Sequence, residues 1–271
     1  MELATNISLL LLGISILVWG ANKFVDHASV IAKHMGISDL VIGLTLIAFG
    51  TSAPEIFVGI SSIVNQNEEI ALGTAIGSNI SNIALIFGVS CLYLTGPSKT
   101  QLWNFVPFGL SVILLGLTLV DGKISFNESM GFVGILMIFM FVLFKTDGLA
   151  EEDSLESNEF GHSLFISLIG LVALIAGANI AVIYAENTAL LLGVPQLIIG
   201  LTIIALGTSL PELAATIVAL RKGRHQMVVG NIIGSNVFNL VFIIPMIEFF
   251  GSVELSPMVM QRDFYILLAL S

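Results

Sequence analysis

The chain has 271 residues, of which 56% are hydrophobic and only 10% are charged, and its mean hydropathy is +1.02. Soluble domains carry roughly 25% charged residues, so this composition excludes a soluble globular protein and indicates an integral membrane protein in a lipid bilayer. The net charge of −10 argues against a nucleic-acid partner, and the single cysteine, Cys91, excludes an internal disulfide.

Apolar runs long enough to cross a hydrocarbon core of about 30 Å recur along the chain. Because the backbone must hydrogen-bond internally in lipid, we expect each run to be a helix. The predicted spans are 5–25, 38–64, 70–94, 103–121, 127–145, 163–185, 195–221 and 227–250. A ninth, incomplete run opens near Phe264, so we expect the natural chain either to continue past Ser271 or to end in a short remnant. The first run lacks a basic segment and a cleavage site, which favours a retained span over a signal peptide.

The nine Lys and Arg residues predict the orientation, because basic connections stay on the cytoplasmic side. With the N-terminus outside, the outer connections hold only Lys123 and Arg262. The cytoplasmic connections then hold Lys23, Lys33, Lys99, Lys145, Arg221, Lys222 and Arg224. We therefore expect a multi-pass protein, placed in the plasma membrane, with its N-terminus outside.

An acidic segment from Asp147 to Glu159 divides the chain into two halves. It carries six carboxylates with Gly and Ser between them, which is typical of a solvated linker. We expect a first half at 1–145, a cytoplasmic linker at 146–161 and a second half at 162–271. A calcium-collecting loop is the alternative, although the spacing fits no EF-hand.

The two halves contain an internal repeat. Gly20–Asn82 aligns without a gap on Gly177–Asn239, and about 26 of the 63 positions are identical. The repeated helices are the second and seventh predicted spans, so the two copies must cross the membrane in opposite directions. Inverted repeats are typical of secondary transporters, which bind their substrate near the midplane between the repeats.

Each copy begins with an acidic motif inside an apolar run: Gly50-Thr51-Ser52-Ala53-Pro54-Glu55 and Gly207-Thr208-Ser209-Leu210-Pro211-Glu212. On a helix the hydroxyls and the carboxylate of each copy would share one face. Each proline also releases a backbone carbonyl four residues earlier, near Gly50 and Gly207. A carboxylate at membrane depth costs about 2.5–3.5 kcal/mol or more, and two in matching positions predict a shared cation.

The next helix of each copy adds a Gly-Ser-Asn segment. The candidate ligands of the two copies are Glu55, Thr51, Ser52, Ser78 and Asn82, and Glu212, Thr208, Ser209, Ser235 and Asn239. Ser and Asn often serve only helix packing in membranes, but the duplication in register argues against packing alone. An all-oxygen set suits Ca²⁺ and Na⁺, whereas zinc and copper prefer His and Cys.

These motifs resemble those of the cation/calcium exchangers, whose two alpha repeats each carry Gly-Thr-Ser-x-Pro-Glu and then Gly-Ser-Asn. The resemblance covers about 38–90 and 195–245. It implies an all-α fold of two inverted five-helix halves, with the last one or two helices incomplete in this chain, and long mobile first and sixth helices. It also implies that Glu55 and Glu212 are shared carboxylate ligands and that Thr51, Ser52, Ser78, Thr208, Ser209 and Ser235 complete the sites.

One departure concerns Asn239, where the potassium-dependent branch carries an acid. The neutral amide weakens the case for potassium cotransport and leaves two fixed charges, which balance one Ca²⁺ or two Na⁺. We expect a Na⁺/Ca²⁺ antiporter that works as a monomer, is not an enzyme and needs no cofactor beyond the transported ions. An H⁺/Ca²⁺ antiporter, or one for another divalent cation, is the alternative, and a cation channel is a distant one.

Overall fold

The computed structural model describes residues 2–93, 100–120, 122–146, 157–195, 199, 203, 205–250 and 259–271. In these residues every regular element is a helix, which confirms the predicted all-α class. Seven of the described helices are long and apolar enough to span a membrane. The predicted acidic linker lies largely outside the described residues, at 147–156.

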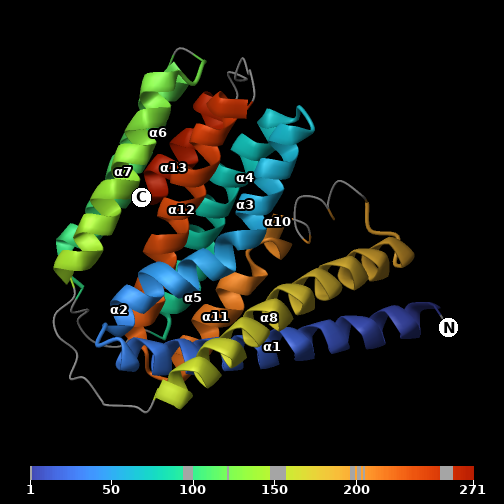
Figure 1. The fold of residues 1–271 in the computed structure, drawn as a ribbon. Coiled ribbons are helices and arrows are strands. Elements are labelled where there is room, and N and C mark those ends of the chain that lie inside the picture. The colour runs from blue at the N-terminus through green and yellow to red at the C-terminus, as the bar shows by residue number, and fades with distance from the viewer. Residues whose placement is uncertain are drawn as a thin grey trace.

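The first half contains α1 (Glu2–His34), α2 (Asp39–Ile42), η1 (Gly43–Ile47), α3 (Ala48–Val64), α4 (Glu68–Ser81), η2 (Asn82–Phe87), α5 (Gly88–Cys91), η3 (Leu102–Phe105), α6 (Val106–Val120) and α7 (Phe126–Thr146). The second half contains α8 (Ser157–Leu191), α10 (Ala205–Gly207), α11 (Leu210–Arg221), α12 (His225–Phe250), η5 (Val259–Phe264) and α13 (Tyr265–Leu270). Figure 1 shows α3, α4 and α12 in one bundle that α6 and α7 flank.

Most predicted spans agree with helices to within a few residues, and three differ. The first and sixth spans are much longer than predicted, because α1 and α8 have 33 and 35 residues. The ends of both helices are polar, so a prediction from hydropathy does not include these extra turns. The seventh span was expected to be one helix at 195–221, but its described part is broken: α10 ends at Gly207, residues 208 and 209 form a turn, and α11 begins at Leu210.

Helix α12 is the centre of the bundle. In the apolar stretch of 18 residues in each helix, 94% is buried in α12, whereas only 17% is buried in α1. The main hydrophobic core joins α12 to α3, α4, α6 and α7, and a second core joins its first turns to α1, α8 and α11. Gly230 and Gly234 let the backbone of α2 and η1 approach, since a Cβ at either position would lie within 2.5 Å of a backbone oxygen of Leu40 or Leu44. Small residues therefore bring the two repeats into close contact.

Helices α1 and α8 run antiparallel side by side and project away from the bundle (Figure 1). They cross at two glycines that occupy the same repeat position, because Gly177 follows Gly20 by 157 residues. A Cβ on Gly20 would lie 2.4 Å from the amide nitrogen of Leu174, and a Cβ on Gly177 would lie 2.3 Å from that of Leu17. Leu174 also follows Leu17 by 157 residues, so the crossing has the two-fold symmetry expected of an inverted repeat.

The turns obey the same register. Positive φ angles occur at Gly36 (65°) and Gly193 (76°), which are repeat counterparts, and at Gln66 (60°) and Gly223 (69°), which are a second such pair. Backbone geometry is therefore repeated even where the residue type is not. The repeat places Gln66 in a left-handed conformation that glycine adopts at lower cost.

Candidate cation site

The first acidic motif lies on α3 and faces the interior. Thr51, Ser52 and Glu55 have exposed fractions of 0%, which confirms that they share the buried face of one helix. Pro54 stands inside α3, and the π-helix η1 immediately precedes this helix. Proline removes one ladder hydrogen bond and a π segment shifts the others, so this stretch of backbone is irregular where the acidic side chain enters.

The second motif differs in local structure from the first. Glu212 and Ser209 are 1% exposed, but Thr208 is only half-buried and lies with Ser209 in the turn before α11. The prediction that Thr208, Ser209 and Glu212 share a helical face is therefore wrong. Pro211 explains the difference, because in the first turn of α11 its missing N–H removes no helical hydrogen bond.

Two side-chain hydrogen bonds join predicted ligands of the two repeats. The Ser52 hydroxyl donates to Oε1 of Glu212 at 3.0 Å, and the Asn239 amide donates to the Ser78 hydroxyl at 3.0 Å. Each bond pairs one predicted ligand from the first repeat with one from the second. The structure therefore brings both copies of the motif to one place between α3, α4, α11 and α12.

A backbone oxygen also belongs to this region. The Ser235 hydroxyl lies 3.5 Å from the carbonyl oxygen of Ala48, and the Thr51 hydroxyl lies 3.4 Å from the same atom. The sequence predicted a released carbonyl near Gly50 or Thr51, not at Ala48. The π-helix η1 ends just before Ala48, and nothing in the sequence marks that segment.

Several buried oxygens at this place have no hydrogen-bond partner. They include both carboxylate oxygens of Glu55, Oε2 of Glu212, the Ser209 hydroxyl and the amide oxygens of Asn82 and Asn239. Glu55 and Glu212 lie in the same buried region, so their carboxylates repel one another when both are ionised. Buried, unpartnered and mutually repelling oxygens are costly, and a cation among them would offset both the desolvation and the repulsion.

The donor set is oxygen throughout. Among the residues that the structure describes, no group of three or more His, Cys, Asp or Glu side chains could hold a metal ion. Any cation here would therefore depend on hydroxyl, amide and backbone oxygens in addition to Glu55 and Glu212. Such mixed oxygen sets suit Ca²⁺ and Na⁺, and the flexible geometry of Ca²⁺ sites tolerates them.

Sequence reasoning missed Asn231 and Thr216. Asn231 accepts a hydrogen bond from Thr51 at 3.3 Å and donates one to Thr216 at 3.1 Å, and all three side chains are buried. Their repeat counterparts are Thr74 and Gly59, so a search for matched positions passes over them. The available signal was helical spacing, because Asn231 precedes Ser235 by four residues on the same face of α12.

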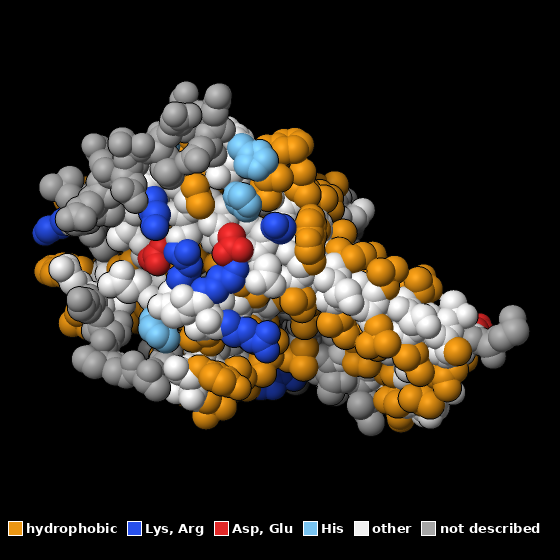
Figure 2. Space-filling model, turned by 90° about the horizontal axis from the view of Figure 1, so that it is seen from below, with side chains coloured by type: hydrophobic (Ala, Val, Ile, Leu, Met, Phe, Trp, Pro, Cys, Tyr) orange, Lys and Arg blue, Asp and Glu red, His pale blue; other side chains and the backbone are white. Residues whose placement is uncertain are grey.

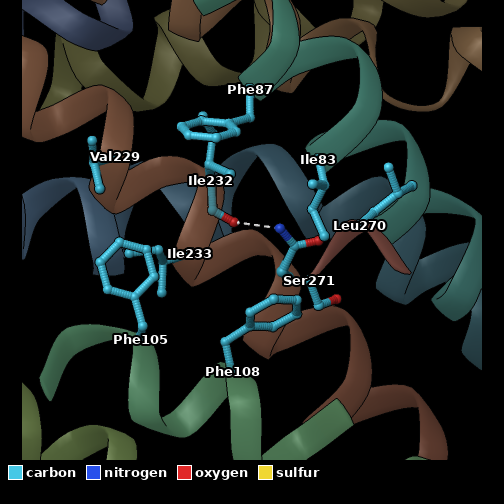
Figure 3. A pocket seen from close by; sticks show the side chains of 10 residues that line it. Ile83, Phe87, Phe105, Phe108, Val229, Ile232, Ile233, Leu270 and Ser271 are labelled. Carbon is cyan, nitrogen blue, oxygen red and sulfur yellow. Dashed lines mark hydrogen bonds between the residues drawn. The ribbon is translucent and has the colours of Figure 1, made fainter. Parts of the chain in front are cut away.

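A neighbouring cavity of about 110 Å³ is apolar and separate from the predicted ligands. Figure 3 shows side chains from η2, η3, α6, α12 and α13 around it. The Asn236 amide reaches the cavity but donates to the carbonyl of Ile232 on its own helix. With only Asn236 and Ser271 polar among apolar neighbours, this cavity is unsuited to a cation.

A family model described as sodium/calcium exchanger protein matches residues 5–145 and 162–271. The putative antiporter CaxA of Alkalimonas amylolytica is 35% identical, over 96% of this chain and 85% of that protein. The inner membrane protein YrbG of Escherichia coli is 33% identical, over 100% of this chain and 87% of that protein. The sodium/calcium exchanger MaX1 of Methanosarcina acetivorans is 31% identical, over 99% of this chain and 90% of that protein.

The fold also matches a solved exchanger structure. The sodium/calcium exchanger from Methanococcus jannaschii superposes with a TM-score of 0.85 at 30% sequence identity, over 99% of this chain and 89% of that one. This match confirms the inverted-repeat exchanger fold, and the seven apolar helices confirm a multi-pass membrane protein. The family match confirms the resemblance carried by the two acidic motifs and supports cation/Ca²⁺ exchange. The chain belongs to the sodium/calcium exchanger family.

Proposed function

We propose that this protein is an antiporter that moves Na⁺ inward to expel Ca²⁺, by alternating access to one site between the repeats. The ligands of this site would be Glu55, Thr51, Ser52, Ser78 and Asn82 with Glu212, Thr208, Ser209, Ser235 and Asn239. The observation that carries the proposal is the hydrogen bond from Ser52 to Glu212, which joins the two copies of the acidic motif in the buried core. Na⁺ and Ca²⁺ would compete for the same oxygens, so neither crosses while the other is bound.

The charge of the site sets the preferred load. Glu55 and Glu212 supply two negative charges, and Asn239 is neutral where an acid would add a third. One Ca²⁺ or two Na⁺ therefore balance the site, and a further Na⁺ would leave it positive. Carrying two bare carboxylates through an occluded state is too costly, so the empty carrier should not return without an ion.

We also propose that the N-terminus lies outside and that the membrane is the plasma membrane. Figure 2 shows Lys and Arg side chains gathered on the face at the bottom of Figure 1. Arg221 ends α11, Lys222 and Arg224 stand in the turn between α11 and α12, and Lys222 pairs with Asp26 near the end of α1. We call this surface, formed by the C-terminal ends of α1 and α7 and by the α11–α12 turn, the basic face. Basic connections stay in the cytoplasm, which supports the proposed orientation.

Isotope flux in proteoliposomes tests the ion coupling. Purified protein would be reconstituted, and ⁴⁵Ca²⁺ uptake would be measured with outward gradients of Na⁺, K⁺ or H⁺ imposed one at a time. The proposal expects uptake with the Na⁺ gradient alone. Uptake driven by a pH gradient without Na⁺ would overturn the sodium version and favour H⁺/Ca²⁺ exchange. Currents far above carrier turnover and independent of a counter-ion would indicate a channel.

A further inference from the structure

The Thr51 side chain has a hydroxyl with one proton, and three acceptors lie near it. Its Oγ1 lies 3.0 Å from the carbonyl oxygen of Ile47, 3.4 Å from that of Ala48 and 3.3 Å from Oδ1 of Asn231. A hydroxyl that binds a cation does so through its oxygen lone pairs, so its proton must point to an acceptor outside the ion. Ile47 ends η1 and Ala48 begins α3, the helix that carries Thr51, whereas Asn231 comes from the other repeat.

The amide of Asn231 is held in one orientation. Its Nδ2 donates to the Thr216 hydroxyl at 3.1 Å, and this bond directs Oδ1 towards Thr51. Thr51, Thr216 and Asn231 are 0%, 1% and 2% exposed, so water does not compete for these bonds. The chain of bonds from α11 through α12 to α3 therefore fixes an acceptor beside Thr51.

The other repeat lacks this arrangement. The counterpart of Asn231 is Thr74, whose hydroxyl donates to Ile70 of its own helix, and the counterpart of Thr216 is Gly59. Thr208, the counterpart of Thr51, is half-buried in a turn. The two threonines are therefore not equivalent, although the motifs that carry them are identical at this position.

We propose that Asn231, supported by Thr216, is a positioning residue that keeps the proton of Thr51 out of the cation site. This inference rests on the proposed function, since it assigns an outer partner to one proposed ligand. Outer partners of ligands commonly change metal affinity by about 10–100-fold. We expect Asn231→Ala to raise the half-saturating concentration of at least one transported cation by roughly 10-fold, and Thr216→Val to act in the same direction more weakly.

The test is calorimetric binding of Na⁺ and Ca²⁺ to purified protein in detergent, with thermal unfolding measured in parallel. Asn236→Ala is the matched control, because Asn236 is a buried amide on the same helix whose side chain bonds only to its own backbone. Asn231→Ala should weaken binding, and Asn236→Ala should leave it unchanged at a comparable loss of thermal stability. If Asn231→Ala and Asn236→Ala bind the cations with equal affinity, the inference is overturned and Asn231 is a packing residue.

A double-mutant cycle separates this inference from the proposed site. If Thr51 is a ligand, Thr51→Val weakens binding, and adding Asn231→Ala to it should cause little further loss. If Thr51→Val weakens cation binding and Asn231→Ala does not, the positioning role alone is overturned. No shift in Thr51→Val overturns the proposed ligand set. Additive losses in the double variant would also count against the positioning role.

A separate observation concerns the basic face. Lys222 Nζ lies 2.5 Å from Oδ1 of Asp26, and Arg224 Nη1 lies 3.3 Å from Oδ1 of Asp39. The Arg224 guanidinium also donates to the Ser29 hydroxyl. These contacts tie the C-terminal part of α1 and the start of α2 to the α11–α12 turn. They join elements of opposite repeats at one end of the molecule.

In the opposite conformation of the transport cycle, the two repeats would exchange roles. The repeat counterparts of these paired residues would then meet at the opposite end of the molecule. The register of 157 residues matches Asp26 and Ser29 with Ile183 and Glu186, and it matches Lys222 and Arg224 with Asn65 and Asn67. The counterpart of Asp39 is Gln196. No pair of opposite charges exists among these counterparts. The arrangement seen here therefore has ion pairs that its exchanged arrangement cannot form.

We infer that these two ion pairs bias the transport cycle towards the arrangement in which the basic face is closed. The side chains are partly exposed, from 25% for Arg224 to 49% for Asp26, so each pair contributes modestly. Losing one pair should shift the conformational equilibrium by about 1.5- to 5-fold, and high salt should reduce the bias in the unmodified protein.

Spin-label distances across the basic face test this bias. Labels at Lys33→Cys on α1 and Lys145→Cys on α7, both exposed positions, would be placed in a Cys91→Ser background. Lys222→Gln with Arg224→Gln should increase the population of long distances, whereas Arg221→Gln, which removes one basic charge at the end of α11, is the control. The exchange Asp26→Lys with Lys222→Asp should restore the short distances. An unchanged distribution in Lys222→Gln with Arg224→Gln, or an equal change in the control, would overturn the inference.

Discussion

At the scale of single residues, the proposed site contains two buried carboxylates whose surroundings differ. Glu212 has one oxygen bonded to Ser52, whereas neither oxygen of Glu55 has a partner. A cation between them therefore gains most from Glu55, which has no other source of compensation. Removing either charge leaves one carboxylate against a divalent ion, so both are expected to be essential.

We predict that Glu55→Gln and Glu212→Gln each reduce Na⁺-driven Ca²⁺ flux by about 100-fold or more, because each removes a proposed ligand and half of the fixed charge of the proposed site. Glutamine keeps the shape of the side chain, so folding should persist. Flux would be measured in proteoliposomes and folding by gel filtration and thermal unfolding. Glu69→Gln, at an exposed position on α4, serves as the control. Normal flux in either buried variant would contradict the site.

The sequence predicted the two motifs at this scale and missed their differences. Thr51 and Thr208 occupy identical sequence positions, yet one is fully buried in a helix and the other is half-buried in a turn. A sequence motif shows which side chains are present. The local backbone structure around the motif sets the direction in which those side chains point. Asn231 was missed for a related reason, because its contact with Thr51 joins residues 180 positions apart.

At the scale of elements, the crossing of α1 and α8 depends on backbone contact. The amide nitrogens of Leu17 and Leu174 occupy the space that a Cβ on the opposing glycine would fill. Helices that touch through glycine approach closely through their backbones, so few side chains interlock at the crossing. The sequence predicted two long helices by resemblance and could not predict their contact.

We predict that Gly177→Ala lowers the thermal stability, by about 1–3 kcal/mol, because its Cβ would overlap the backbone of Leu17. Gly161→Ala on the same helix is the matched control, since a Cβ there meets nothing within 4 Å and alanine favours a helix. Thermal unfolding in detergent would compare the two. Equal stabilities would show that α1 and α8 can separate at this crossing without cost.

The turn between α3 and α4 gives a second prediction for elements. Gln66 has a φ of 60°, and its repeat counterpart Gly223 adopts 69°. A left-handed conformation costs about 1–2 kcal/mol for a residue with a Cβ, so Gln66→Gly should raise thermal stability, and Gly223→Gln should lower it. The same unfolding assay measures both. A loss of stability in Gln66→Gly would mean that the glutamine side chain makes a contact worth more than the strain.

At the scale of the whole molecule, inverted symmetry was predictable from sequence and asymmetry was not. The gap-free register of the repeat predicted opposed halves, and the paired glycines at 20 and 177 confirm that register in space. The departures from symmetry depend on tertiary contacts. They include Pro211 at the start of α11, the bonds of Asn231 and the ion pairs of the basic face. These features give the two ends of one repeated structure different properties.

The fixed charge of the site gives a prediction for the complete transport cycle. Two carboxylates and one Ca²⁺ sum to zero, so Ca²⁺/Ca²⁺ exchange should not respond to membrane potential. Na⁺-driven exchange should respond if more than two Na⁺ move for each Ca²⁺, because a transported charge gains about 2.3 kcal/mol per 100 mV.

Asn239→Asp would give the Ca²⁺-loaded site a negative charge and should make Ca²⁺/Ca²⁺ exchange voltage-dependent. Asn236→Asp, one turn away in the apolar cavity, is the control. Fluxes in proteoliposomes held at potentials set by K⁺ and valinomycin would measure each case, and a voltage-dependent Ca²⁺/Ca²⁺ exchange in the unmodified protein would contradict a site with only two fixed charges.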